Sequence, residues 1–270
     1  MYLIIGLLII AIGAFCQSSS YVPINKIKDW SWESYWIVQG VFAWLLFPLL
    51  GALLAVPAGE SLFALFGAYP KESLLTILFG ILWGVGGLTF GLSMRYLGVA
   101  LGQSIALGTC SGLGAILGPV FTGHAADLTG AVIIGVVVTL VGIAIIGVAG
   151  AMKATSLPEE EKKKAVKDFN FGKGILVALL AGFMSACFNI GLSFGAPLTW
   201  AQTKPIFATL PATLLVTFGG FLTNAVYCFF QNGKNKTWSD YRKGALWGHN
   251  LLICALAGLL WYSQFFGLSL

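Results

Sequence analysis

The residues of this sequence that could do chemistry are amides, hydroxyls and tryptophans inside long apolar stretches. In the final stretch, Asn250, Trp261 and Gln264 are spaced so that they fall on one stripe of a helix. Trp83 lies on a similar stripe within residues 74–95. Amides both donate and accept hydrogen bonds, and an indole offers a flat apolar face. This combination suits a neutral polyol such as a sugar.

Other apolar stretches carry the same kinds of polar residue on shared helix faces. Gln17 lies three residues before Ser20, and Ser185 lies four before Asn189. The sequence therefore predicts a substrate-binding set of Gln17, Trp83, Asn189, Asn224, Asn250, Trp261 and Gln264. The alternative is that these polar groups bond neighbouring helices or a carbonyl one turn back. The spacing alone leaves both interpretations open.

Two residues are candidates for handling protons. His249 precedes Asn250 near one end of the final stretch, and its charge can change near neutral pH. Glu33 follows Ser31, a residue suited to capping a helix. An acid in the first turn of a helix is also favoured by the helix dipole, and a histidine at a helix end can be purely interfacial. Both structural alternatives stay open.

The elements that must position these residues are membrane-spanning helices. Hydrophobic residues make up 58% of the 270 residues and charged residues 9%, whereas about a quarter of a soluble domain is charged. A helix needs about 20 apolar residues to cross a bilayer. Eight windows without Asp, Glu, Lys or Arg meet that length, which predicts eight spans: 1–25, 34–59, 73–94, 96–126, 128–152, 174–203, 205–233 and 244–270.

Small residues and tryptophans predict how these helices pack and where they end. Glycines four residues apart let helix backbones approach closely in lipid. Such pairs predict tight packing within the bundle, with a dimer face as the alternative: 80 with 84, 87 with 91, 98 with 102, 108 with 112, and 114 with 118. Tryptophans near helix ends are predicted to rest at headgroup level, as an aromatic belt does: Trp30, Trp32, Trp36, Trp238 and Trp247.

The composition also excludes several classes of protein. No nucleophile–base pair, metal-ligand spacing or phosphate-binding loop occurs, so we expect no enzyme, no catalytic residue, no metal and no cofactor. The spans hold no acid or base deep inside, which argues against a charged ion path. The net charge of +5 is explained by loop charges rather than by a nucleic-acid partner. The oligomeric state is left open.

The loop charges predict an orientation. Thirteen of the 15 Lys and Arg residues fall in the odd-numbered loops, and only Lys71 and Lys204 fall in the even-numbered ones. Basic residues gather in cytoplasmic loops, so the odd loops are expected in the cytoplasm and the N-terminus outside. The predicted location is a bacterial inner membrane, crossed several times.

Two stretches far apart in the chain resemble each other. LFGILWGVGGLTFGLS begins at residue 78, and LAGLLWYSQFFGLSL ends the chain. A repeat of helix three in helix eight means a unit of five helices, and an odd unit inserts its second copy upside down. The expected fold is an all-α membrane bundle of two inverted five-helix repeats, 1–152 and 174–270, joined by a cytoplasmic linker at 153–173. Eight of ten helices are then present, the second repeat being incomplete; chance similarity is the alternative.

The stretches NKIKDWSWESYW, LWGVGGLTFGLSMRYLG and HNLLICALAGLLWYSQFF resemble the bacterial L-rhamnose–proton symporters of the drug/metabolite transporter superfamily. The resemblance runs through the whole chain. It implies a ten-helix carrier that imports L-rhamnose or a related sugar with a proton, with the sugar, the proton and the bilayer as partners. Two alternatives remain: a carrier of the same superfamily that exports or exchanges another metabolite, and a membrane sensor or subunit that does not transport.

Overall fold

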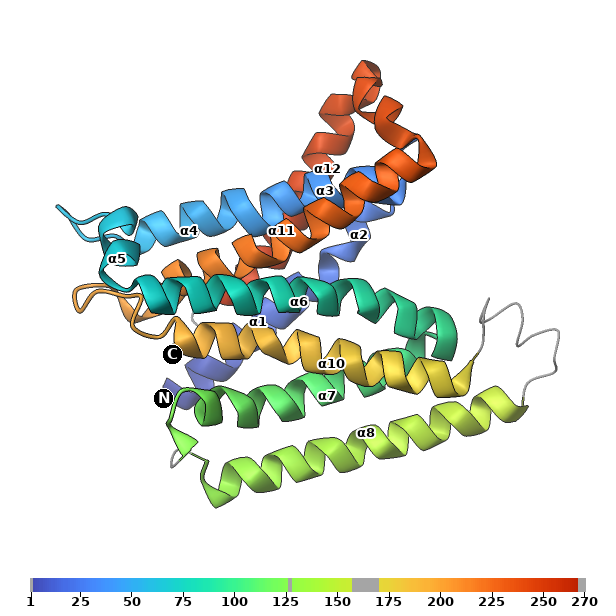
Figure 1. Cartoon of the computed structure of the whole chain (residues 1–270), viewed down its shortest axis with the longest axis horizontal. Helices are drawn as coiled ribbons and strands as arrows, with labels where there is room; N and C mark the ends of the chain where they lie inside the picture. Colours follow the sequence, from blue (N-terminus) through green and yellow to red (C-terminus); the bar gives the residue numbers. More distant parts are fainter. Residues whose placement is uncertain (1, 126–127, 157–169, 267–270) are drawn as a thin grey trace. The chain divides into compact units, whose positions relative to one another are not determined.

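The computed structural model describes residues 2–125, 128–156 and 170–266, and within these ranges it contains helices and no strand. The chain forms two compact units (Figure 1). Unit 1 contains Met1–Leu78 and Gly195–Leu270, and unit 2 contains Phe79–Phe194. The long helix α6, Pro70–Leu97, begins in unit 1 and continues into unit 2.

Unit 1 is built from the two ends of the chain. Its middle is formed by α3, α4 and α11, with α12 packed against α3 and the segment between α3 and α4. Short helices connect these longer ones. In chain order the elements are α1 Tyr2–Ser19, α2 Tyr21–Ile24, α3 Trp32–Gly40, η1 Val41–Leu46, α4 Phe47–Ala55, α5 Leu62–Ala68, η3 Pro205–Phe207, α11 Leu210–Asn235, η4 Thr237–Arg242, α12 Gly244–Tyr262 and η5 Ser263–Phe265.

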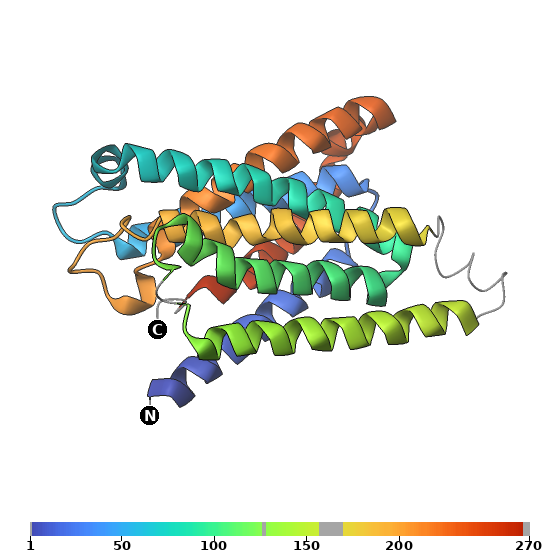
Figure 2. The same cartoon turned by 60° about the horizontal axis from the view of Figure 1, so that its bottom comes forward.

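Unit 2 is a smaller bundle of long helices. It holds the rest of α6, then α7 Val99–Phe121, α8 Gly130–Ser156 and α10 Phe171–Phe194. In both views α7 lies between α8 and α10 (Figures 1 and 2). Gly98, with a φ of 83°, makes the turn from α6 to α7, a conformation that a glycine adopts without strain.

Seven helices in the described ranges are long and apolar enough to cross a membrane. They are Gly6–Ile24, Trp32–Ala55, Pro70–Leu97, Leu101–Phe121, Gly130–Gly150, Phe171–Phe194 and Pro205–Asn235. Each falls on one of the first seven predicted windows. The eighth window corresponds to α12 and η5, and its last residues, 267–270, lie outside the described ranges. The count of eight spans therefore stays a prediction.

The span Trp32–Ala55 is interrupted at its centre by a π-helical segment, Val41–Leu46. Proline has no N–H and its ring clashes with the carbonyl four residues earlier, so Pro48 cannot continue an α-helix from Trp44. The chain responds by widening the turn, and the N–H of Phe47 donates to the carbonyl of Phe42, five residues back. The interruption is a local consequence of Pro48.

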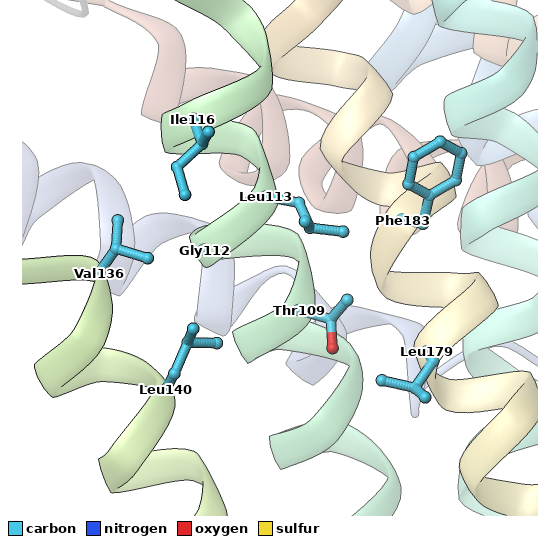
Figure 3. Close-up of a pocket in the computed structure, with 8 residues that line it drawn as sticks. All are labelled: Thr109, Gly112, Leu113, Ile116, Val136, Leu140, Leu179 and Phe183. Carbon is cyan, nitrogen blue, oxygen red and sulfur yellow. The ribbon is translucent and has the colours of Figure 1, made fainter. Parts of the chain in front are cut away.

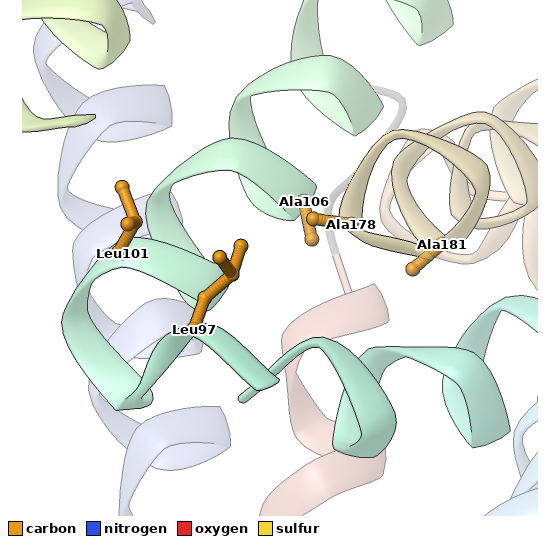
Figure 4. Packing of buried hydrophobic residues seen from close by; sticks show 5 residues of the cluster. All are labelled: Leu97, Leu101, Ala106, Ala178 and Ala181. Carbon is orange, nitrogen blue, oxygen red and sulfur yellow. The ribbon is translucent and has the colours of Figure 1, made fainter. Parts of the chain in front are cut away.

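Close helix packing in unit 2 depends on glycines. A side chain at Gly182 on α10 would meet Cβ of Thr109 and, at 2.7 Å, the carbonyl oxygen of Ala106, both on α7. The adjoining apolar cluster of Leu97, Leu101, Ala106, Ala178 and Ala181 is buried at the same crossing (Figure 4). Small residues here bring the two backbones together, as the sequence predicted.

The predicted glycine pairs have mixed outcomes. The space beside five of these glycines is filled by other residues of unit 2, which confirms packing within the bundle at positions 102, 108, 112, 114 and 118. At Gly87 and Gly91 nothing described lies within 4 Å of an added Cβ, so the prediction of close packing is wrong for that pair. A glycine stripe marks where close approach is permitted, and the neighbouring helix decides whether it occurs.

The compact units do not follow the predicted repeat boundaries. Unit 1 joins the first part of the predicted first repeat to most of the second. The compact units group helices that pack together, whereas a repeat is defined by its order along the chain. The boundaries 1–152 and 174–270 are therefore not tested and stay a prediction. Residues 157–169 of the predicted linker 153–173 lie outside the described ranges.

We predict that Gly182→Ala lowers the free energy of unfolding by about 1–3 kcal/mol, because the added methyl group overpacks the crossing of α10 and α7. Thermal unfolding of the purified protein in detergent measures the change. Gly135→Ala on α8 is the matched control, since nothing described lies within 4 Å of its added Cβ and alanine favours helix. Equal melting temperatures for the two variants would contradict the close approach at Gly182.

Candidate functional site

The side chain of Asn250 is fully buried in unit 1 and holds a turn of the chain. Its Nδ2 donates to the carbonyl oxygen of Lys28 at 2.8 Å, and its Oδ1 accepts from the N–H of Lys28 at 3.1 Å. One amide thereby satisfies both backbone groups of one residue, far away in sequence. The arrangement ties the start of α12 to the loop before α3.

Asn224 of α11 is also buried and bonded within the protein. Its Oδ1 accepts from Nε1 of Trp36 at 3.0 Å, and its Nδ2 donates to the carbonyl oxygen of Gly220 at 2.9 Å. The bond to Trp36 links α11 to α3 in the interior of unit 1. Sequence position predicted Trp36 to be a headgroup anchor, and this bond holds its indole against α11.

Glu33, at the start of α3, is 5% exposed and lies against the end of α11. Its Oε1 accepts from Nδ2 of Asn235 at 2.9 Å and from Oγ1 of Thr237 at 2.8 Å. The same Thr237 hydroxyl lies 2.8 Å from Oδ1 of Asn232, whose Nδ2 donates to the hydroxyl of Tyr241 at 2.9 Å. The carboxyl group is therefore part of a connected set of polar side chains.

Asp240 is the second buried acid of this set. Its Oδ2 accepts from the N–H of Ser31 at 2.8 Å and from the hydroxyl of Ser34 at 3.0 Å, while Oδ1 pairs with Nζ of Lys243 at 2.8 Å. Burial acts to raise the pKa of Asp240, but these donors, Lys243 foremost, outweigh it and lower the pKa to about 2. Asp240 is thus ionised at neutral pH and fastens η4 to the start of α3.

His249 is exposed, and its Nε2 lies 3.0 Å from the carbonyl oxygen of Lys26. Trp30, predicted to rest at headgroup level, is instead 8% exposed, with its ring 5.4 Å from Trp247 and 6.1 Å from Tyr241. The anchor prediction is wrong for Trp30. The aromatic side chains of neighbouring segments cover it, which a position near a helix end does not reveal.

At the far end of α12, Gln264 and Trp261 lie together. Nε2 of Gln264 donates to the carbonyl oxygen of Trp261 at 2.8 Å, and both side chains are half-buried. An added Cβ at Gly13 would lie 3.1 Å from Cα of Gln264, so α1 passes close to this end of α12. Gln17, one turn further along α1, is also half-buried.

A chain of aromatic rings runs through unit 1 from α3 to α12. The ring centroids of Trp32 and Trp36 are 5.5 Å apart, those of Trp36 and Trp44 are 5.6 Å apart, and those of Trp44 and Trp261 are 6.1 Å apart. Trp261 in turn lies 5.2 Å from Phe265. Of these rings, the predicted substrate set contained only Trp261.

Beside this chain of rings lies a buried amide that the predicted set omitted. Gln39 of α3 is 4% exposed, and no described group hydrogen-bonds to its Oε1. A signal for it was present in the sequence. Trp32, Trp36 and Gln39 are spaced by four and three residues, the same spacing that singled out Trp261 and Gln264.

In unit 2, the predicted residues Trp83 and Asn189 lie on facing helices, α6 and α10. The ring of Trp83 meets Phe188 edge-on at 4.9 Å, and the side chain of Asn189 lies over Gly114 of α7. Asn189 is exposed at the surface of this unit. The predicted set is thus divided between the two units, with five members in unit 1 and two in unit 2.

Unit 2 also contains an apolar groove of about 460 Å³ (Figure 3). Its lining holds no charged group and one hydroxyl, that of Thr109. A sugar needs several donors and acceptors, so this groove does not fit one. Its lining residues are Thr109, Gly112, Leu113, Ile116, Val136, Leu140, Leu179 and Phe183.

These features define a multi-pass helical membrane protein whose polar interior holds amides, hydroxyls and indoles together with two buried carboxyl groups. Residues 1–269 match the family described as L-rhamnose-proton symport protein (RhaT), and the chain belongs to that family.

Curated relatives agree with the family match. The chain is similar to the L-rhamnose-proton symporter of Cronobacter sakazakii, with 34% identity over 97% of this chain and 77% of the relative. It is 33% identical to the symporter of that name from Klebsiella pneumoniae and 32% identical to one from Escherichia coli, each over 94% of this chain and 76% of the relative. No solved structure matches the chain.

We predict that acid weakens unit 1 through Asp240. Because its pKa is lowered from 3.8 to about 2, the ionised group stabilises the fold above pH 4, and that contribution is lost as the pH falls towards 2. The loss amounts to about 2 kcal/mol.

The measurement compares unfolding of the wild type and Asp240→Asn in detergent at pH 5, 4, 3 and 2. The variant cannot titrate at position 240, so the stability difference between the two proteins should shrink as the pH falls. Glu33 is present in both proteins, so its contribution cancels in the difference. A difference that stays constant from pH 5 to pH 2 would rule out the ion pair with Lys243 as its source.

Proposed function

We propose that this chain is a secondary transporter that imports L-rhamnose, or a closely related sugar, together with a proton. The observation that carries the proposal is the match to the symporter family over residues 1–269, with relatives of that name aligned over 94–97% of the chain. The seven apolar spans fit a protein that crosses the membrane several times, as a transporter must. The uncharged amides and indoles of the interior support a neutral substrate.

The proposed setting is a bacterial inner membrane with the N-terminus outside. The support is the distribution of basic residues, 13 of which fall in the odd-numbered loops. We further propose eight spans arranged as two inverted repeats, 1–152 and 174–270. The similarity of residues 78–93 to the end of the chain supports this arrangement.

The proposed sugar contacts differ in what a substrate would have to displace. Trp83, Asn189, Trp261, Gln264 and Gln17 are half-buried or exposed within their units, so a ligand could reach them without breaking the fold. The amides of Asn224 and Asn250 are bonded within the protein on both sides. A sugar could bind those two only by replacing these bonds.

For proton coupling, Glu33 is the better supported of the two candidates. It is buried among polar partners that join α3 to α11, so a change in its protonation changes hydrogen bonds between helices. His249 is exposed and meets one backbone carbonyl. We propose Glu33 as the proton carrier and His249 as the second candidate.

We predict that cells producing this chain accumulate labelled L-rhamnose and that a proton uncoupler abolishes the accumulation. Movement of sugar against its gradient needs the proton gradient in a symporter. In a second measurement, adding rhamnose to lightly buffered, energy-depleted cells should cause protons to enter, which raises the pH of the medium. Cells carrying the empty vector are the control. Accumulation that resists the uncoupler would exclude proton symport, and efflux of preloaded metabolite would favour an exporter.

We predict that a membrane-impermeant maleimide labels Lys71→Cys but not Lys236→Cys in intact cells, in a chain whose five native cysteines are replaced by serine. The first position lies in an even loop and the second in an odd loop, which the charge distribution places outside and inside. Labelling of both after permeabilisation is the control. The opposite pattern in intact cells would mean that the N-terminus lies inside.

A further inference from the structure

One unexplained feature of unit 1 is the buried amide of Gln39. Its Oε1 is buried and accepts no hydrogen bond from any described group. A buried acceptor without a partner costs about 1–3 kcal/mol relative to one that is bonded. In a membrane protein the cost is not relieved by solvent. Such an atom calls for an explanation, and a hydroxyl donor of a bound sugar is one.

The surroundings of Gln39 fit a sugar. Trp36 lies one turn before it on the same face of α3, held in place by the 3.0 Å bond to Asn224. The ring of Trp44 folds back onto Gly40, the residue next to Gln39, where an added Cβ would come within 2.7 Å of it. The two indoles are in edge contact with each other. An amide flanked by aromatic rings can bond a hydroxyl while the rings cover the apolar face of a pyranose.

The π-helical turn that precedes Pro48 lies at the same place. The π-helical segment Val41–Leu46 begins two residues after Gln39. A π-helical turn holds about one residue more than an α-helical turn, and such turns occur often at functional sites. If the extra residue moves along the helix, the ring of Trp44 leaves Gly40 and the side of α3 that carries Gln39 is uncovered. Pro48 keeps the segment from settling as a regular α-helix.

We propose that Gln39, beside the paired rings of Trp36 and Trp44, binds a hydroxyl group of the transported sugar, and that it is reached when the π-helical turn after it changes register. The inference rests on the proposed function, because it assigns a residue to the sugar site of that transporter. It adds a contact in the α3 span to those predicted on α1, α6, α10, α11 and α12.

Replacing Gln39 distinguishes a binding role from a packing role, because the two roles predict opposite effects of the replacement on the melting temperature. Replacing a buried amide that has an unbonded acceptor with an apolar group of similar size removes a cost, so Gln39→Leu should melt at the wild-type temperature or above it. The same change should weaken sugar binding, because one hydrogen bond to a neutral ligand is lost. The expected loss of affinity is roughly two- to tenfold.

The experiment measures binding of labelled L-rhamnose and thermal unfolding on the purified full chain, for the wild type, Gln39→Leu and Gln103→Leu. Gln103 lies exposed on α7 in unit 2, so its replacement by leucine is the matched control and should leave affinity unchanged. Trp44→Leu is the second test variant. It should also weaken binding, since it removes one of the rings that flank the amide.

The outcomes separate the two proposals. Weaker rhamnose binding by Gln39→Leu with unreduced melting temperature, and wild-type binding by Gln103→Leu, support the inference. Wild-type affinity in Gln39→Leu overturns it and leaves the proposed function standing. A lower melting temperature in Gln39→Leu also overturns it, since the amide would then be a packing group. Absence of rhamnose binding by the wild type would overturn the proposed function itself, and with it the sugar role of Gln39.

Discussion

The structure depends on one constraint: inside a bilayer, a polar group that is not bonded to the protein has no water to bond. Helices meet this requirement for the backbone, which is why the described chain is helical throughout its spans. Polar side chains must meet it through partners on other segments. Asn224 bonds an indole of α3 and Asn250 bonds the backbone of Lys28. The few polar atoms that fail the requirement are therefore the informative ones.

The same constraint explains the network of buried polar side chains around Glu33 and Asp240 at one end of unit 1. Glu33 and Asp240 are both buried there, and each carboxylate is surrounded by donors from other segments. The donors on Asp240 outweigh its burial, so its charge is retained in the interior. The network joins the starts of α3 and α12 to the end of α11.

Away from this polar network, the interior of unit 1 is packed mainly by aromatic rings. Aromatic rings replace bonded polar groups along α3 and the π-helical turn, and the amide of Gln39 lies among them without a partner for its oxygen. In unit 2, glycines allow α7 and α10 to touch, and the groove is apolar.

The sequence by itself determined the class of protein and the first seven spans, because apolar length and the absence of charge are properties of consecutive residues. Resemblance to the symporter family was also readable from short stretches, and the match over residues 1–269 confirms it. The sequence also predicted which residues share one face of a helix, but it did not predict which segment that face contacts. That depends on the neighbouring helix: Gly182 and Gly87 look alike in sequence, yet among the described residues only the added Cβ of Gly182 meets another helix. In the same way, tertiary structure decided that the amide of Asn250 bonds Lys28 while the oxygen of Gln39 bonds no described group, because a hydrogen bond is made by two segments and one stretch of sequence contains only one of them.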